Sequence, residues 1–130
     1  MGQVVKSVLA AVTVAATVVM GAEVPAQAAA SGVKGILNAG SVGRIGIFEY
    51  FRASGGADYD ALLAENAYSD DRYDWWDQYG GFYVGPGYCA QRWVSSGRTG
   101  PWTRVNPNVT GPARSRTDGD YYVKVVPFVC

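Results

Sequence analysis

The side chains of this chain that could do chemistry are mostly carboxylates. Four aspartates lie close together, at Asp70, Asp71, Asp74 and Asp77, and the glutamates Glu49 and Glu65 precede them. Two carboxylates roughly 5–10 Å apart across a cleft can hydrolyse a glycosidic bond. A domain of about 100 residues has little room for a deep cleft. We therefore expect the aspartates to form a solvated face. The alternative is that these carboxylates are catalytic and that the protein is a secreted toxin or a small carboxylate-based hydrolase.

The aspartate cluster also offers oxygen atoms of the kind that calcium prefers. Its spacing differs from that of an EF-hand loop, and no glycine lies within residues 70–77. We predict no metal site and no cofactor, while calcium binding by residues 70–77 stays an alternative.

Histidine is absent from the whole sequence, and cysteine occurs only twice. These absences exclude histidine-based acid–base catalysis and the Ser-His-Asp arrangement. They also exclude zinc sites that contain histidine and the zinc site built from four cysteines. No glycine-rich phosphate loop joins a predicted strand to a helix. We predict that the protein is not an enzyme.

Aromatic side chains are the most informative positive feature. All 17 follow residue 47, and nine of them fall within residues 68–93. Most of these rings should fill the core of a small domain, but the adjacent Trp75 and Trp76 cannot both face one core. Exposed tryptophan and tyrosine supply a large, rigid contact area. The candidate binding residues are Tyr73, Trp75, Trp76, Tyr79, Tyr83 and Arg98, the last at the tip of a predicted hairpin over residues 96–100.

The N-terminal residues have the order of an export signal. Lys6 precedes an apolar run over residues 8–22, and Ala26-Gln27-Ala28 forms a small-residue cleavage site. The run is about 15 residues long, shorter than the roughly 20 that span a bilayer. We predict a signal peptide over residues 1–28 and one mature extracellular domain over residues 29–130, with no membrane attachment after cleavage. The excess of arginine over lysine is typical of a bacterium with a GC-rich genome.

Both cysteines, Cys89 and Cys130, lie in the predicted mature part. In an exported chain, such a pair predicts one internal disulfide. That part carries ten basic and ten acidic residues, so its net charge gives no reason to expect binding to nucleic acid. Acids concentrate in residues 58–77 and arginines in residues 92–116. We expect these two segments to lie side by side and neutralise each other, and a bipolar surface is the alternative.

Two short helical segments are expected. Residues 58–67 begin with a capping Asp58 and continue with alanines and leucines that favour a helix. Ser69 would cap a second short helical turn within residues 69–79.

The rest of the chain is β-like. Alternating apolar residues and turn signals predict strands within 33–37, 43–51, 82–84, 88–95, 101–105, 113–117 and 120–129. Asp118-Gly119 is a two-residue hairpin signal between the last two strands. Pro127 predicts that the last strand ends at a sheet edge or bulges there.

The sequence thus predicts a β-rich domain, α+β by count. It would form a small antiparallel sheet or a compact β-sandwich, with one short helix near residues 58–67 and one disulfide. The function that fits best is a small secreted, non-enzymatic binding protein, monomeric, that inhibits or caps an extracellular protein through an aromatic-rich surface. A module that binds cell-wall glycan or another polysaccharide is the second alternative. No motif in the sequence justifies assigning it to a family.

Overall fold

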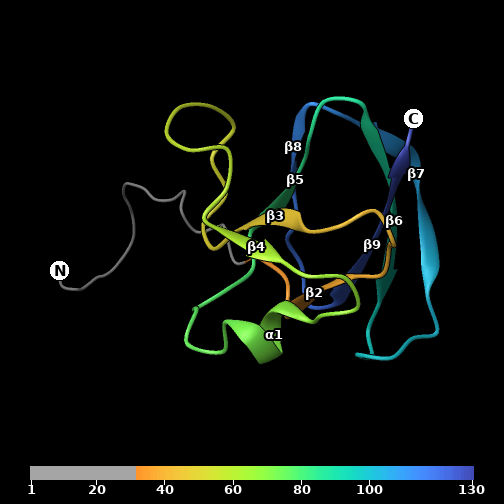
Figure 1. Cartoon of the computed structure of the whole chain (residues 1–130). Helices are drawn as coiled ribbons and strands as arrows, with labels where there is room; N and C mark the ends of the chain where they lie inside the picture. The colour runs from red at the N-terminus through yellow and green to blue at the C-terminus, as the bar shows by residue number, and fades with distance from the viewer. Residues whose placement is uncertain (1–31) are drawn as a thin grey trace, which may run out of the picture. The chain divides into compact units, whose positions relative to one another are not determined.

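The computed structural model describes residues 32–130, and the predicted signal peptide lies outside the described residues. The described part is β-rich and contains two four-stranded sheets and one short helix (Figure 1). The elements are β2 (Gly35–Asn38), β3 (Ile45–Phe48), β4 (Ala61–Leu63), α1 (Ser69–Arg72), β5 (Gly81–Val84), β6 (Tyr88–Ser95), β7 (Thr103–Thr110), β8 (Ala113–Arg116) and β9 (Tyr122–Val129).

One sheet has the strand order β2-β9-β6-β7, and the other has the order β4-β3-β5-β8. All pairings are antiparallel except that of β2 with β9, which is parallel. Chain neighbours β5 and β6 lie in different sheets, as do β8 and β9. The chain therefore crosses between the sheets several times, which gives many long-range contacts.

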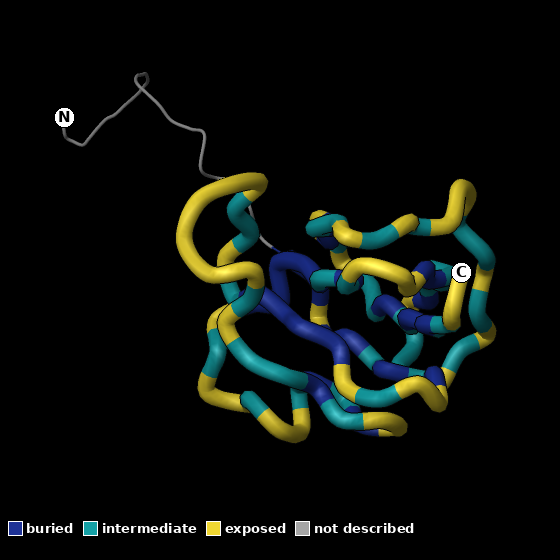
Figure 2. The backbone as a smooth tube through the Cα atoms, turned by 45° about the horizontal axis from the view of Figure 1, so that its top comes forward, coloured by how far each residue is buried: buried dark blue, intermediate teal, exposed yellow. Residues whose placement is uncertain are grey.

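Both sheets contribute to one hydrophobic core. Ile36 and Val125 come from the first sheet, and Ile47, Leu63 and Phe82 come from the second; all five are completely buried. Along β9, every second residue is buried. In β3, by contrast, all four residues are buried, as expected for a strand covered on both faces. Figure 2 shows the buried strands inside and the exposed segments mostly in the connections. The sandwich form of the fold prediction is therefore confirmed.

The predicted helix over residues 58–67 is wrong. Ala61–Leu63 forms strand β4 instead, which pairs antiparallel with β3. Leu63 is completely buried, and the Asp60 carboxylate accepts a hydrogen bond from the Glu49 amide. Pairing with a central strand and burial of Leu63 outweigh the weak helical preference of alanine and leucine.

The single helix lies a few residues later, at α1. It is one turn long and ends at Tyr73, so only the start of the segment over residues 69–79 is helical. Ser69 does not cap it: Tyr68 holds the N-cap position, and the Ser69 hydroxyl is buried and accepts a hydrogen bond from the Ile36 amide at 2.7 Å. The side chain that looked like a cap therefore ties α1 to β2.

The hairpin predicted at Asp118-Gly119 is also wrong, because β8 and β9 belong to different sheets. Thr117 holds this connection: its amide donates to the Gly80 carbonyl, and its hydroxyl donates to the Tyr79 carbonyl at 2.9 Å. The hairpin over residues 96–100 is confirmed, since it joins the antiparallel pair β6 and β7.

The end of β9 agrees with the sequence. Strand β2 pairs with β9 only as far as Val125, so Pro127 has a strand neighbour on one side alone, Ala90 of β6. The disulfide prediction is confirmed, because Cys89 and Cys130 are bonded and their Cα atoms are 5.1 Å apart. The bond fastens the last residue of the chain to the start of β6.

Candidate binding surface

Four of the candidate residues gather in one cluster between α1 and β5, named here the 73–79 cluster: Tyr73, Trp75, Trp76 and Tyr79. Trp76 stacks between the two tyrosines, with ring centroids 5.0 Å from Tyr73 and 5.9 Å from Tyr79. Trp75 meets Tyr73 edge to face at 5.7 Å. Trp75 is 71% exposed, whereas Tyr79 is only 5% exposed. The expectation that one of the two adjacent tryptophans is exposed is confirmed.

Hydrogen bonds fix the rings on which Trp75 rests. The Tyr73 hydroxyl donates to the Leu62 carbonyl at 2.8 Å, and the Tyr79 hydroxyl donates to the Tyr73 carbonyl at 2.6 Å. Tyr73 and Trp76 also pack against the hydrophobic core. Trp75 therefore projects into solvent beside two rings, Tyr73 and Trp76, that pack against the core.

The surroundings of the cluster are acidic. Burial raises the pKa of the Tyr79 phenol to about 12, and the charges of Asp70 and Asp74 add to this effect. Within residues 32–130, Asp74, Asp77 and Glu49 form no ion pair with lysine or arginine. A partner that carries basic groups would therefore be attracted to this surface.

Tyr50 extends the surface beside the cluster and is 53% exposed. Its hydroxyl donates a hydrogen bond to the Asp77 carboxylate, which is the main reason that the pKa of Tyr50 is raised to about 12. The Asp77 amide in turn donates to the Glu49 carboxylate at 2.9 Å. These bonds connect the end of β3 to the segment that carries Trp75. The sequence analysis missed Tyr50 because it lies outside the aromatic-dense segment.

Arg98 does not join the aromatic cluster. Its guanidinium forms ion pairs with Asp70, at 3.0 Å, and with Asp71, and lies 3.9 Å from the ring centre of Tyr68. The hairpin tip is thereby fastened to α1. Arg114 pairs in the same way with Asp58. The expectation that the acidic and basic segments lie side by side is therefore confirmed.

Tyr83 lies away from the cluster, on β5, where its ring centroid is 6.0 Å from that of Tyr59. Both rings line a shallow groove of about 210 Å³. The other residues of this groove are Val42, Arg44, Ile45, Gly46, Leu62, Val84, Gly85, Tyr88 and Pro127. These residues come from separate parts of the chain, so no local sequence signal points to the groove.

No group of three or more acidic, cysteine or histidine side chains in residues 32–130 could hold a metal ion. In the same part of the chain, no helix has the length and apolar character needed to cross a membrane.

The fold and the exposed surface together define a small disulfide-bonded β-sandwich that displays the exposed ring of Trp75 beside Tyr73. Comparison of the chain with protein-family models, curated proteins and solved structures finds no match.

Proposed function

We propose that the protein is a small secreted, non-enzymatic binding protein whose 73–79 cluster recognises an extracellular protein. The observation that carries this proposal is Trp75, which is 71% exposed and supported by Tyr73 from behind. A large apolar side chain in water is unfavourable until a partner covers it. Tryptophan is also the residue type most enriched where interfaces derive their binding energy.

The rigid mounting of the surface supports the same function. A side chain already held in place loses little conformational entropy when a partner binds, so more of the contact energy becomes affinity. The export signal predicted over residues 1–28 and the Cys89–Cys130 bond are consistent with an extracellular location.

A protein partner is favoured over a glycan. Glycan platforms use several exposed rings in a row. Near the cluster, the exposed aromatic residues are Trp75 and Tyr50, and the Tyr50 hydroxyl is hydrogen-bonded to Asp77. Within residues 32–130, the carboxylates of Asp74 and Asp77 form no ion pair with lysine or arginine, which favours a basic protein surface over neutral sugar.

The test is a capture experiment with oxidised protein spanning residues 29–130. It is immobilised and exposed to culture fluid of the producing organism and, separately, to its washed cell wall. We expect a discrete protein whose affinity falls about ten-fold or more in Trp75→Ala, a loss equivalent to about 1.4 kcal/mol. Tyr88→Ala is the matched control, because Tyr88 is an exposed aromatic residue that lines the separate groove.

Three results would count against this proposal. Retention on cell wall alone would indicate glycan binding. Equal capture by wild type and Trp75→Ala would remove the cluster from the interface, and loss of capture in Tyr88→Ala alone would move the interface to the groove.

A further inference from the structure

The groove beside Tyr83 is a concave part of the surface that the proposed function leaves unused. Both sheets line it, since Gly46 and Tyr83 belong to one and Tyr88 and Pro127 belong to the other. Small-molecule sites are typically concave and mostly apolar, with a few polar groups that orient the ligand. The groove has this composition, because Arg44 alone is charged among the described residues that line it.

Two aromatic rings lie next to each other in the lining. A Cβ atom at Gly46 would come within 2.5 Å of two ring carbons of Tyr59, so this ring rests directly on the main chain of β3. Gly46 pairs with Tyr83 across β3 and β5, and the ring centroids of Tyr59 and Tyr83 are 6.0 Å apart. The groove therefore offers aromatic surface against which a ligand ring can pack.

Arg44 gives the groove its positive charge. Its side chain is exposed, and in the described part of the chain it forms no ion pair with an acidic residue. A guanidinium has several N–H groups in one plane, so it can bind both oxygens of a carboxylate at once. The charge of the groove therefore complements a carboxylate.

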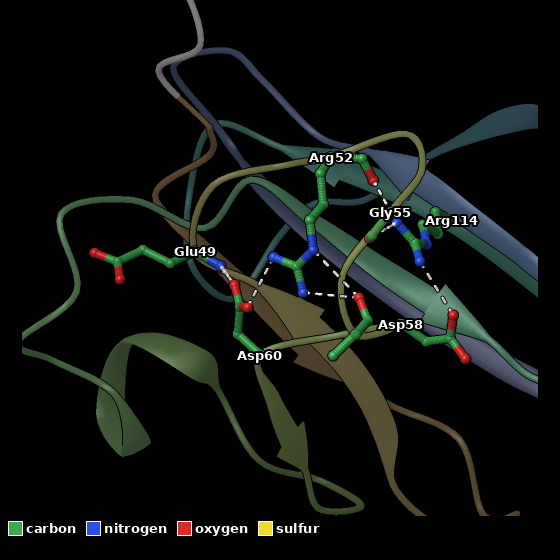
Figure 3. A network of polar contacts seen from close by, with 7 residues as sticks. Glu49, Arg52, Gly55, Asp58, Asp60 and Arg114 are labelled. Atoms are coloured by element: carbon green, nitrogen blue, oxygen red, sulfur yellow. Dashed lines mark hydrogen bonds and ion pairs between the residues drawn. The ribbon is translucent and has the colours of Figure 1, made fainter.

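The two aspartates that flank Tyr59 in the chain are already paired with other arginines. Asp58 forms an ion pair with Arg114 at 3.1 Å (Figure 3). Asp60 forms one with Arg52 at 2.9 Å, also drawn in Figure 3. Because neighbouring guanidiniums offset these two negative charges, they add little repulsion toward an anion in the groove.

The volume of the groove limits the size of its ligand. It holds about 210 Å³. An apolar cavity of about 150 Å³ holds one benzene molecule, whereas pockets for drug-sized ligands begin at about 300 Å³. One six-membered ring with a short carboxylate arm therefore fits, and a row of sugar rings does not.

We propose that this groove binds a small, free aromatic carboxylate. The ligand ring packs against Tyr59 and Tyr83, and the ligand carboxylate pairs with Arg44. Contact between rings adds to the gain from burying apolar surface, and the charge pair determines which end of the ligand faces the guanidinium.

A free carboxylate is favoured over the C-terminal residue of a peptide. Extended peptides are bound largely through main-chain hydrogen bonds, but Gly46 is already paired with strands on both sides, and the Gly85 carbonyl accepts an amide within the fold. The hydroxyls of Tyr59 and Tyr83, in contrast, form no hydrogen bond within the described chain. The polar groups that remain for a ligand are therefore on side chains.

This inference goes beyond the proposed function and does not depend on it. The groove would hold a small molecule, whereas the 73–79 cluster would contact a protein. Loss of protein capture in Trp75→Ala says nothing about the groove, and an empty groove leaves the proposed function intact.

The experiment titrates isotope-labelled, oxidised protein spanning residues 29–130 with phenylacetate and follows the backbone amide signals by NMR. We expect saturable binding with a Kd of about 0.1–1 mM, a range suited to a ligand of roughly ten non-hydrogen atoms. The amide signals of Gly46 and Gly85 should shift. The signal of Gly97, beyond the other end of β6, should stay in place.

The variants separate the charge from the ring. Arg44→Met should weaken phenylacetate binding about ten-fold or more, because it removes the charged hydrogen bonds. Binding of the uncharged benzyl alcohol should be equal in Arg44→Met and wild type. Arg72→Met is the matched control and should bind phenylacetate like the wild type, because Arg72 is also exposed, forms no ion pair within the described residues and lies on α1.

Four results would overturn the inference. The first is the absence of a saturable shift at Gly46 and Gly85, and the second is an equal phenylacetate affinity in Arg44→Met and wild type. Tighter binding of octanoate than of phenylacetate would assign the groove to acyl chains. Tighter binding of a peptide that ends in phenylalanine would assign it to a peptide terminus.

Discussion

Replacement of Asn38 by alanine should destabilise the fold more than any surface substitution. Asn38 ends β2 and is completely buried. Its side-chain amide donates to the carbonyls of Gly43 and Leu63, each at 3.0 Å, and its carbonyl oxygen accepts from the Gly40 amide at 3.2 Å. One side chain thus joins β2 of the first sheet to β4 of the second.

The size of the effect follows from these three bonds. A buried polar group left without a partner costs about 1–3 kcal/mol. The bond to Gly43 is only partly buried, so the bonds to Leu63 and Gly40 should dominate, and we expect a loss of about 3 kcal/mol. For a domain of this size, that corresponds to a fall in Tm of roughly 12–24 °C.

The assay is urea unfolding followed by tryptophan fluorescence, with Asn108→Ala as the matched control. Asn108 is exposed and accepts one hydrogen bond from Arg104, so its replacement should change the free energy of unfolding by no more than about 0.5 kcal/mol. Equal, small losses in the two variants would refute the reasoning that the buried hydrogen bonds of Asn38 hold the two sheets together.

Two further predictions concern the whole domain. Replacing Cys89 and Cys130 together by alanine should lower the free energy of unfolding by about 4 kcal/mol, because the bond closes a loop with a sequence separation of 41; chemical denaturation of both forms measures this. The raised pKa of Tyr79, about 12, favours the protonated phenol in the fold. Its stabilising contribution is therefore complete below pH 10 and is lost as pH rises through about 12. Because the pKa of Tyr50 is also raised to about 12, ultraviolet tyrosinate titration should show two late-ionising phenols in wild type and one fewer in Tyr79→Phe. Wild-type titration of every phenol near pH 10 would contradict the prediction.

The parts of the fold that the sequence predicts well are those encoded locally. Strand β6 occupies the predicted residues 88–95, because its apolar residues lie between clear turn signals. The disulfide follows from there being only two cysteines in the predicted mature part. The exposure of one of the two adjacent tryptophans follows from their geometry, but only the structure shows that the exposed one is Trp75.

The parts that the sequence predicts poorly depend on distant partners. Strand β4 is short and has helix-favouring residues, and only its pairing with β3 makes it a strand. Strand β7 extends to Thr110, beyond the predicted residues 101–105, because β6 pairs with it across Pro107 and its neighbours. The groove beside Tyr83 and the connection over residues 52–58, which Arg114 contacts, likewise require residues separated by tens of positions to meet.

The arginines show how a domain with a modest core can still hold its surface rigid. A guanidinium has five N–H donors in a plane, so one side chain can satisfy several acceptors at once, which the ammonium of lysine does less well. Arg114 uses this capacity on two loop carbonyls and one carboxylate, and Arg98 uses it on two carboxylates of α1. The excess of arginine over lysine therefore has a structural use: Arg114 and Arg98 fasten irregular segments of the chain, the connection over residues 52–58 and the tip over residues 96–100, to neighbouring elements.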